Sequence, residues 1–456
     1  MPIFGRRKET KRDRRVVVLA IDGTPYSLLR RLMEEGVMPN YQRLTGNGTF
    51  TRMYSTQPTV SSVAWTAFMC GKDPGGTNIF GFTDLQPNSY QLDIPDSTRI
   101  RSKLVWEHLG EMGKRSVSLG VPISYPVRPI NGVMVGCFLS PKLDKAVHPP
   151  EYLDLLKRID YRLDTDAWLA REDLERFWLE LLVVFERRRE TMLHFLDHER
   201  WDVLMVHFME TDRMMHFMID QYFKGEEPWA GRFREFFGRV DDLIGDIDTR
   251  VPEEDDLVIL SDHGFCPIRY EVYPNRVLYE EGLLKFRSWP PKSIMEIAED
   301  SRAFVMDPGR IYVNVKGKYP MGTVMPEAQA RVADEVAELL VEKLVDPETG
   351  EKMVANVHRR DEIYTGPHRE RGPDIVLEPR WGYDLKGAVN KEEVTGRTAL
   401  CGMHTYEDAH LYVRGRQLGM PGSGPEGKPA IQDVAPTMLA MMGLPVPEEM
   451  TGKVLF

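Results

Sequence analysis

Cysteine is scarce in this chain of 456 residues, and its few cysteines are widely spaced. The four are Cys70, Cys137, Cys266 and Cys401, and no two of them form a Cys-x-x-Cys pair. Disulfide frameworks and zinc knuckles both use closely spaced or paired cysteines, so this pattern argues against either. We therefore expect reduced thiols, as in a cytoplasmic protein.

Long hydrophobic runs are also missing. The first apolar run, Val16 to Ile21, is too short for the core of a signal peptide or for a membrane span. A basic run from Arg6 to Arg15 precedes it, and we expect residues 1–14 to form a basic, disordered tail. Transient contact of this tail with anionic lipid is the alternative. The sequence thus predicts a cytoplasmic protein without a transmembrane segment.

An excess of positive charge is missing as well. The net charge of −11 argues against a protein that coats nucleic acid, so no stable nucleic-acid partner is expected. Internal repeats and low-complexity tracts are not visible. The sequence carries no indication of the oligomeric state.

What the chain does have is acidic and histidine residues at or just past apolar runs. The motifs are Asp22 after Val-Val-Val-Leu-Ala-Ile, Asp212-x-x-x-His216 after Leu-Met-Val-His-Phe, Asp262-His263-Gly264 after Leu-Val-Ile-Leu-Ser, and Gly402-Met403-His404. Such runs predict strands buried on both faces of a parallel sheet, at whose carboxyl ends ligands collect. Carboxylate and imidazole are preferred ligands of divalent metals. A single Asp there is usually a cap or turn residue, but the set predicts a metal site built from distant segments.

A cluster of hydroxyl side chains lies between the first two of these motifs. Thr59, Ser61 and Ser62 occupy what reads as a loop that enters a helix. The N-terminus of a helix carries free N–H groups and a partial positive charge, which suit a phosphate or an ionised hydroxyl. A capping box is the purely structural explanation, but no Glu or Gln stands three residues after Ser61 or Ser62.

With these motifs in order, the chain resembles the alkaline phosphatase superfamily and, within it, the type I phosphodiesterase/nucleotide pyrophosphatase family. The resemblance runs from about Arg14 to the C-terminus and includes a closing segment, Ile431 to Lys453. It implies a three-layer α/β/α sandwich with a mostly parallel central sheet and a smaller inserted α/β domain. It also implies that Ser61 is the nucleophile, three residues after Pro58.

The resemblance further implies two divalent metal ions. One would be held by Asp22, Asp262, His263 and the nucleophile Ser61, and the other by Asp212, His216 and His404. Zinc suits this mixture of Asp and His ligands best, and manganese is a possible substitute.

Two positions depart from the family pattern. Phosphodiesterase relatives usually carry an Asn three residues after the nucleophile, where this chain has Ala64. Where relatives often read Pro-x-x-His-Gly, this chain reads Pro74-Gly75-Gly76-Thr77-Asn78. Ser61 has no neighbouring Arg, which disfavours a small phosphate monoester, and the Cys/Ser-x-Pro-x-Arg signature of sulfatases is absent.

The length of the chain favours one large α/β domain with an inserted domain. About 140 residues separate His263 from His404, too many for a connection within a compact sheet. We expect residues 15–266 and 401–456 to form the catalytic domain. Residues 267–400 would form the insert over the active site, with strands at 310–315 and 374–377 and a helix at 326–344.

Several other residues have competing interpretations. Trp65 is either near the substrate or buried by packing, and Arg213 either neutralises phosphate or points away from it. His207 and His410 lie in or beside apolar runs, so core or supporting roles are favoured over metal ligation. The Arg187-Arg188-Arg189 run, in a helical segment at 164–198, is expected to be a solvated face.

The sequence therefore predicts a metal-dependent hydrolase of small-molecule phosphoesters, most consistent with a phosphodiesterase that forms a phospho-serine intermediate. Within the same superfamily the alternative is a phosphomonoesterase or phosphomutase, which the missing Asn at Ala64 keeps open. A non-catalytic metal-binding homologue is the rival from another class. The physiological substrate is not determined by the sequence.

Overall fold

An eight-stranded sheet forms the centre of the molecule in a computed structural model that describes residues 14–456. In spatial order its strands are β2 (Gly48–Met53), β19 (Ala409–Arg414), β9 (Asp256–Leu260), β1 (Val16–Ile21), β8 (Val203–Phe208), β5 (Ser116–Leu119), β6 (Gly132–Val135) and β7 (Val147–His148). The five strands from β9 to β6 are parallel, whereas β19 and β7 pair antiparallel with their neighbours. The predicted mostly parallel sheet is confirmed.

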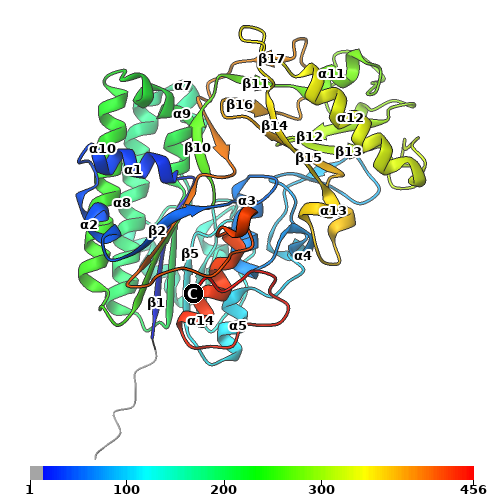
Figure 1. Cartoon of the computed structure of the whole chain (residues 1–456). Helices are drawn as coiled ribbons and strands as arrows, with labels where there is room; N and C mark the ends of the chain where they lie inside the picture. The colour runs from blue at the N-terminus through cyan, green and yellow to red at the C-terminus, as the bar shows by residue number, and fades with distance from the viewer. Residues whose placement is uncertain (1–13) are drawn as a thin grey trace, which may run out of the picture.

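Helices cover both faces of this sheet (Figure 1). One layer contains α1 (Tyr26–Glu34), α2 (Pro39–Thr45), α8 (Leu174–His198), α9 (Glu210–Lys224) and α10 (Trp229–Arg250). The other contains α3 (Ser61–Cys70), α5 (Val105–Glu111) and α14 (Val434–Met441). The three-layer sandwich is thus confirmed.

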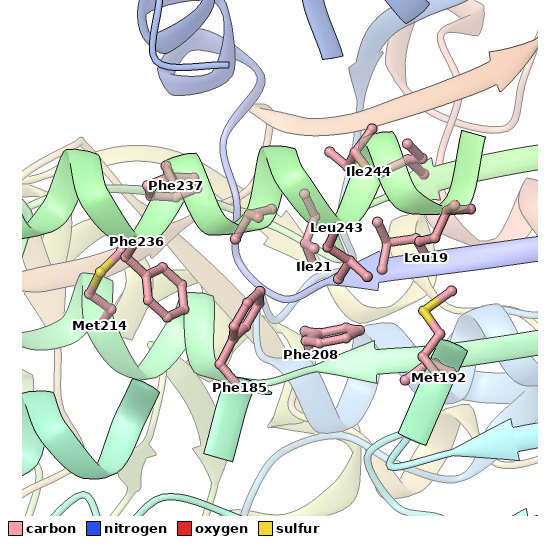
Figure 2. Close-up of a cluster of buried hydrophobic side chains, with 14 of the residues drawn as sticks. Leu19, Ile21, Phe185, Met192, Phe208, Met214, Phe236, Phe237, Leu243 and Ile244 are labelled. Carbon is pink, nitrogen blue, oxygen red and sulfur yellow. The ribbon is translucent and has the colours of Figure 1, made fainter. Parts of the chain in front are cut away.

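Strand β1 shows why the sheet needs both layers. Val17, Leu19 and Ile21 pack into the core on the side of α8 and α10, while Val16, Val18 and Ala20 pack into the opposite core. Successive side chains of a strand point to opposite faces, so an uninterrupted apolar run is stable only when both faces are covered. Figure 2 shows part of the first core, where Phe185 packs edge-on against Phe236 at 5.1 Å between ring centroids.

The arginine run at 187–189 is not a solvated face, and that expectation is wrong at its central residue. Arg188 is only 1% exposed and pairs with the fully buried Glu210 at 3.0 Å. Arg187 and Arg189 remain partly exposed and pair with surface acids. Arg188 follows Phe185 by three residues and precedes Met192 by four, so it lies on the apolar face of α8.

A second, smaller α/β unit lies beside one end of the sheet (Figure 1). Its four-stranded sheet has the order β12 (Ala303–Met306), β13 (Arg310–Val313), β15 (Ile375–Pro379), β14 (Val354–Arg359), next to α11 (Pro274–Glu280) and α12 (Gln329–Lys343). A three-stranded sheet joins β16 (Tyr383–Leu385), β11 (Tyr270–Val272) and β17 (Thr395–Gly396). These elements share a core of their own, which also contains Tyr90 from the first part of the chain. The domain boundaries at 266/267 and 400/401 stay a prediction.

The remaining elements are short. They are α4 (Pro74–Thr77), α6 (Leu153–Ile159), α7 (Leu169–Glu172), α13 (Arg360–Ile363), β3 (Asp84–Leu85), β4 (Leu92–Asp93), β10 (Gly264–Pro267) and β18 (Gly402–Thr405). In the part of the chain that the structure describes, we find no helix of the length and apolar character needed to cross a bilayer. The prediction for the basic tail falls almost entirely on residues 1–13, which lie outside the described residues.

Candidate active site

The predicted ligands meet at the carboxyl ends of three neighbouring strands. Asp22 directly follows β1, Asp212 lies in the first turn of α9 after β8, and Asp262 and His263 follow β9. The antiparallel ribbon of β10 and β18 brings His404 to the same place, opposite Phe265. Every predicted metal ligand is therefore found at one edge of the sheet, as expected for parallel strands.

The first group of ligands consists of Asp212, His216 and His404, which could hold one metal ion. Asp212 and His216 lie one turn apart on α9, and His216 Nε2 is 3.5 Å from Asp212 Oδ1. His404 Nε2 lies 3.2 Å from both Asp212 Oδ1 and His216 Nε2. The Nδ1 atom of His216 is 2.9 Å from the carbonyl oxygen of Gly402, a contact that fixes the ring and turns Nε2 towards the group.

The second group surrounds His263. Its Nε2 atom lies 3.3 Å from Asp262 Oδ2, 3.7 Å from Asp22 Oδ1 and 3.2 Å from Ser61 Oγ. Asp212 is also close enough to share a metal with Asp22 and His263, so its carboxylate stands between the two groups. The rings of His263 and His404 stack with centroids 3.7 Å apart. The two groups are thus neighbours.

The chemistry of these side chains fits divalent cations. Asp212 Oδ1 and Asp262 Oδ2 are buried and accept no hydrogen bond from any residue between 14 and 456. Three buried carboxylates without matching buried cations are costly unless a positive charge binds among them. Imidazole and carboxylate together match zinc, with manganese as a weaker match.

The electrostatics of these side chains agree with this interpretation. Burial lowers the pKa of His263 to about 3 and that of His216 to about 4, so both rings are neutral at pH 7 and can donate lone pairs to a metal. Burial, together with the charge of Asp22, raises the pKa of Asp262. Burial opposes ionisation of Asp212 too, but His216 and His404 outweigh it and lower its pKa.

Ser61 is the first residue of α3 and is 8% exposed. Its Oγ lies 3.3 Å from Asp22 Oδ1, and within the described part of the chain the backbone N–H groups of Ser61 and Ser62 have no acceptor. The neighbouring hydroxyls lack these contacts. Thr59 Oγ1 donates to the carbonyl of Thr56, and Ser62 Oγ is buried without a partner among residues 14–456. Of the three hydroxyl groups, that of Ser61 is the one found in contact with predicted metal ligands among the described residues.

Three side chains hold Asp22 in place. Trp65 Nε1 donates to Asp22 Oδ2 at 2.8 Å, His207 Nε2 is 2.6 Å from the same oxygen, and Thr211 Oγ1 donates to the Asp22 carbonyl at 2.6 Å. Trp65 is therefore a buried residue with a specific polar contact, a role that neither sequence interpretation included. His207 has a supporting role, as predicted, and His410 is buried with Nδ1 2.9 Å from the Thr24 carbonyl oxygen.

The two departures from the family pattern also have clear positions. Ala64 is fully buried in the core between α3 and the sheet, so it does not reach the site. Pro74–Thr77 forms α4, where the backbone of Gly75 contacts the insert: His368 N donates to the Gly75 carbonyl at 2.9 Å. A Cβ atom on Gly75 would lie 2.0 Å from the Thr365 carbonyl oxygen, which explains a glycine there.

A cavity of about 470 Å³ opens above the site. Ser61, Asp212, His216 and His404 line it, whereas Asp22, Asp262 and His263 lie beneath its surface. Most of the other wall is apolar or aromatic and comes partly from the predicted insert: Phe82, Phe138, Met209, Leu377, Pro379, Trp381, Leu385, Leu400, Met403 and Tyr406. A substrate bound at Ser61 would therefore lie between the two parts of the chain.

Charged residues in this wall were missed by the sequence analysis, apart from Arg213. Arg213 pairs with Asp164 at 2.7 Å and lies 3.9 Å from Asp212 Oδ2, and it does line the cavity. Lys386 lines it as well and pairs with Asp384 at 2.6 Å. Glu378 accepts from Gln57 at 3.1 Å. The sequence carried no signal for Lys386 or Glu378. Gln57 could have been indicated only by its closeness to Ser61 in the sequence.

Comparisons with known proteins agree with the family and the fold. The model of the type I phosphodiesterase/nucleotide pyrophosphatase family matches residues 16–407. Phosphonoacetate hydrolase from Sinorhizobium meliloti 1021, in complex with phosphonoacetate, has a TM-score of 0.64 at 16% identity, covering 94% of this chain and 96% of that chain. An inactive variant of murine ectonucleotide pyrophosphatase/phosphodiesterase 5, in complex with AMP, has a TM-score of 0.57 at 15% identity, covering 95% and 96%. A search of curated proteins finds no match.

Proposed function

The chain belongs to the type I phosphodiesterase/nucleotide pyrophosphatase family of metal-dependent phosphoester hydrolases, and from that premise we propose that it cleaves small-molecule phosphodiesters or pyrophosphates through Ser61. One observation carries the proposal. Ser61 Oγ lies at the start of α3, 3.2 Å from His263 Nε2 and 3.3 Å from Asp22 Oδ1, on the wall of a cavity that Asp212, His216 and His404 also line.

In this proposal the side chains have distinct roles. Asp22, Asp262 and His263, with Ser61, would hold one divalent cation, for which zinc is proposed and manganese is the alternative. Asp212, His216 and His404 would hold the second. Two bound cations supply positive charge that favours an ionised oxygen and offsets the charge of the phosphoryl group.

The reaction would proceed in two displacements at phosphorus. Ser61 Oγ forms a bond to phosphorus while the bond to the leaving oxygen breaks, and the Ser61 proton ends on that oxygen, which gives a phospho-serine and an alcohol or phosphate. Water then attacks the phospho-serine, its oxygen forms the new bond to phosphorus, and one of its protons returns to the leaving Ser61 oxygen. The free N–H groups at the start of α3 face the developing negative charge. His207 and Trp65 keep Asp22 in position throughout.

The cavity wall favours a diester over a small monoester. Its apolar and aromatic side chains offer contact area to the organic groups of a diester, of which a small monoester carries only one. Of the ligands in the two similar structures, AMP carries an aromatic group and phosphonoacetate does not. We therefore propose a substrate that carries a flat or apolar organic group on its phosphoryl group.

The first test compares bis-p-nitrophenyl phosphate with p-nitrophenyl phosphate, using protein stripped of metal and then resupplied with zinc or manganese. The proposal requires metal-dependent cleavage that is faster for the diester. A preference for the monoester would instead support the phosphatase or phosphomutase alternative. Bound metal without turnover of either compound would support the non-catalytic homologue.

The second test separates Ser61 from its neighbours. Ser61→Ala should lower kcat/KM by roughly a thousandfold or more, because the nucleophile is lost. Ser62→Ala is the matched control, since the Ser62 hydroxyl has no hydrogen-bond partner among the described residues, and it should keep activity. Metal content by mass spectrometry should stay largely intact in both. Activity that survives Ser61→Ala but is lost in Thr59→Ala or Ser62→Ala would refute the assignment.

We also propose a cytoplasmic location, which the four free cysteines support. Cell fractionation with an antibody against the chain tests it directly.

A further inference from the structure

A second cavity, of about 260 Å³, lies between residues 80–88 and the insert. It shares no lining residue with the cavity above Ser61. Its wall consists of Phe80, Asp84, Leu85, Gln86, Pro87, Asn88, Tyr312, Lys318, Tyr319, Glu370 and Arg371. Neither the proposed reaction nor the predicted metal ligands make use of it.

The charges that line this cavity do not cancel. Its two acidic residues are already paired: Asp84 with the buried Arg310 at 2.8 Å, and Glu370 with Arg360 at 3.1 Å. Lys318 Nζ donates only to the carbonyl oxygen of Glu370, at 3.1 Å. Among residues 14–456, neither Lys318 nor Arg371 has a carboxylate within ion-pair distance. The wall therefore presents two cations whose charge is not neutralised.

The surroundings make these cations less stable without a counter-ion. Burial lowers the pKa of Lys318 against the attraction of Asp374 and Glu370, and nearby Arg360 lowers it further. Burial also lowers the pKa of Arg371, as do Arg99 and Arg101, against the attraction of Asp84 and Asp93. A bound anion would relieve both the burial penalty and the repulsion.

The rest of the wall is flat and aromatic. Tyr319 stacks on Tyr90 with centroids 5.6 Å apart, and Lys318 Nζ lies 5.6 Å from the Tyr319 ring centroid. Phe80 packs edge-on against Tyr364 at 5.3 Å. Tyr319 lines the cavity, and its hydroxyl has no hydrogen-bond partner among the residues that the structure describes. Two cations, a free hydroxyl and aromatic faces together match a small organic dianion.

We propose that this cavity binds an organic phosphate monoester, with its phosphate at Lys318 and Arg371 and its apolar part against Tyr312 and Tyr319. This rests on the proposed function in one respect: hydrolysis of a phosphodiester releases a phosphate monoester, so the ligand class is also that of the product. The site would then report product concentration.

Residues 80–88 connect this cavity to the active site. Phe82 and Thr83 line the cavity above Ser61, and the adjacent Asp84 lines the second cavity. Arg310 fixes this junction, because it donates to both the Thr83 carbonyl at 2.7 Å and the Asp84 carboxylate at 2.8 Å. A ligand that displaces this segment would therefore move part of the substrate wall and change turnover without competing with substrate.

Calorimetry with phenylphosphonate, a dianion that is not hydrolysed, tests binding on the full, metal-loaded chain. Two binding events are expected. Lys318→Gln and Arg371→Gln should each weaken one event by roughly tenfold, while chelation of the metals should remove the other. Lys316→Gln is the matched control, because Lys316 is an exposed lysine two residues from Lys318 that does not line the cavity, and it should leave both events unchanged. Lys318→Arg keeps the charge and should restore binding if Lys318→Gln has weakened it.

The proposed site would be overturned by a single binding event that disappears when the metals are chelated. It would also be overturned if the affinity for phenylphosphonate were the same in Lys318→Gln and Arg371→Gln as in the unchanged protein. Equal affinity for inorganic phosphate at the second event would overturn the organic part of the assignment.

Regulation is tested by turnover of bis-p-nitrophenyl phosphate with phenylphosphonate present. A non-competitive component that is lost in Lys318→Gln is expected, and purely competitive inhibition would overturn the coupling. If no phosphodiester is cleaved but Lys318-dependent binding remains, the proposed function fails and the site stands.

Discussion

Replacement of Arg188 by Met should destabilise the protein far more than its position in an arginine run suggests. Arg188 is 1% exposed, and Glu210, its partner, is fully buried. The guanidinium also donates to the Tyr161 hydroxyl at 2.6 Å and to the Leu163 carbonyl at 3.2 Å. Met fills similar space but provides no donor, so the Glu210 carboxylate would lose its only described side-chain partner.

The expected cost follows from the burial of the pair. Loss of one partner from a buried ion pair typically costs about 3–5 kcal/mol, because the remaining charge stays in a medium of low dielectric constant. Arg187 offers the matched comparison, since its pairing with Glu190 at 3.1 Å is exposed. Exposed pairs contribute about 0–1 kcal/mol, so Arg187→Met should change the free energy of unfolding by no more than that.

Urea denaturation at pH 7.5 followed by circular dichroism measures both variants. The double variant Arg188→Met, Glu210→Gln removes the unpaired charge and should recover part of the loss. Glu210 stands two residues before Asp212 in the first turn of α9, so Arg188→Met should also reduce zinc affinity. The burial argument would be refuted if Arg188→Met and Arg187→Met had the same small effect.

Two further predictions concern residues around the site. Trp65→Phe removes the donor to Asp22 Oδ2 and should weaken zinc binding by about 10–100-fold, as measured by competition with a chromophoric chelator; unchanged affinity would contradict the role of Trp65. Burial lowers the pKa of His410 to about 4, whereas an unfolded histidine titrates near 6.5. The unfolded chain thus binds more protons between these values, so stability should fall as pH drops from about 6.5 to 4, by up to about 3 kcal/mol from this group. In His410→Asn that share of the pH dependence should disappear from urea unfolding curves, and an identical pH slope in both proteins would contradict it.

The location of the site could be predicted from the sequence because it depends on strand ends. Asp22, Asp212 and Asp262 each follow an apolar run, and parallel pairing of β8, β1 and β9 necessarily brings those ends together. His404 is different. It reaches the site through an antiparallel ribbon with β10. The sequence placed His404 among the four motifs, but only the family resemblance assigned it to the second metal.

The cavity wall and Arg188 were beyond the same reasoning for different reasons. The cavity wall joins distant segments, since Phe82 and Lys386 are about 300 residues apart in the sequence and Glu378 lies near Lys386. These residues meet only through the packing of the insert, which local sequence patterns do not determine. Arg188 did leave a signal, because its spacing from Phe185 and Met192 continues the apolar face of α8. When the three arginines are treated as one solvated run, the helical spacing that places Arg188 on the apolar face is lost.

Asp22 shows how the core and the chemistry are linked. Its Oδ2 atom is occupied by Trp65 Nε1 at 2.8 Å and His207 Nε2 at 2.6 Å, on buried residues of α3 and of strand β8. Only Oδ1 then faces Ser61 and His263, at 3.3 and 3.7 Å. Because one oxygen is held by the core, Asp22 can offer a cation a single oxygen in a fixed direction. The packing of α3 on the sheet therefore sets the geometry of the predicted metal ligand as well as the position of the predicted nucleophile.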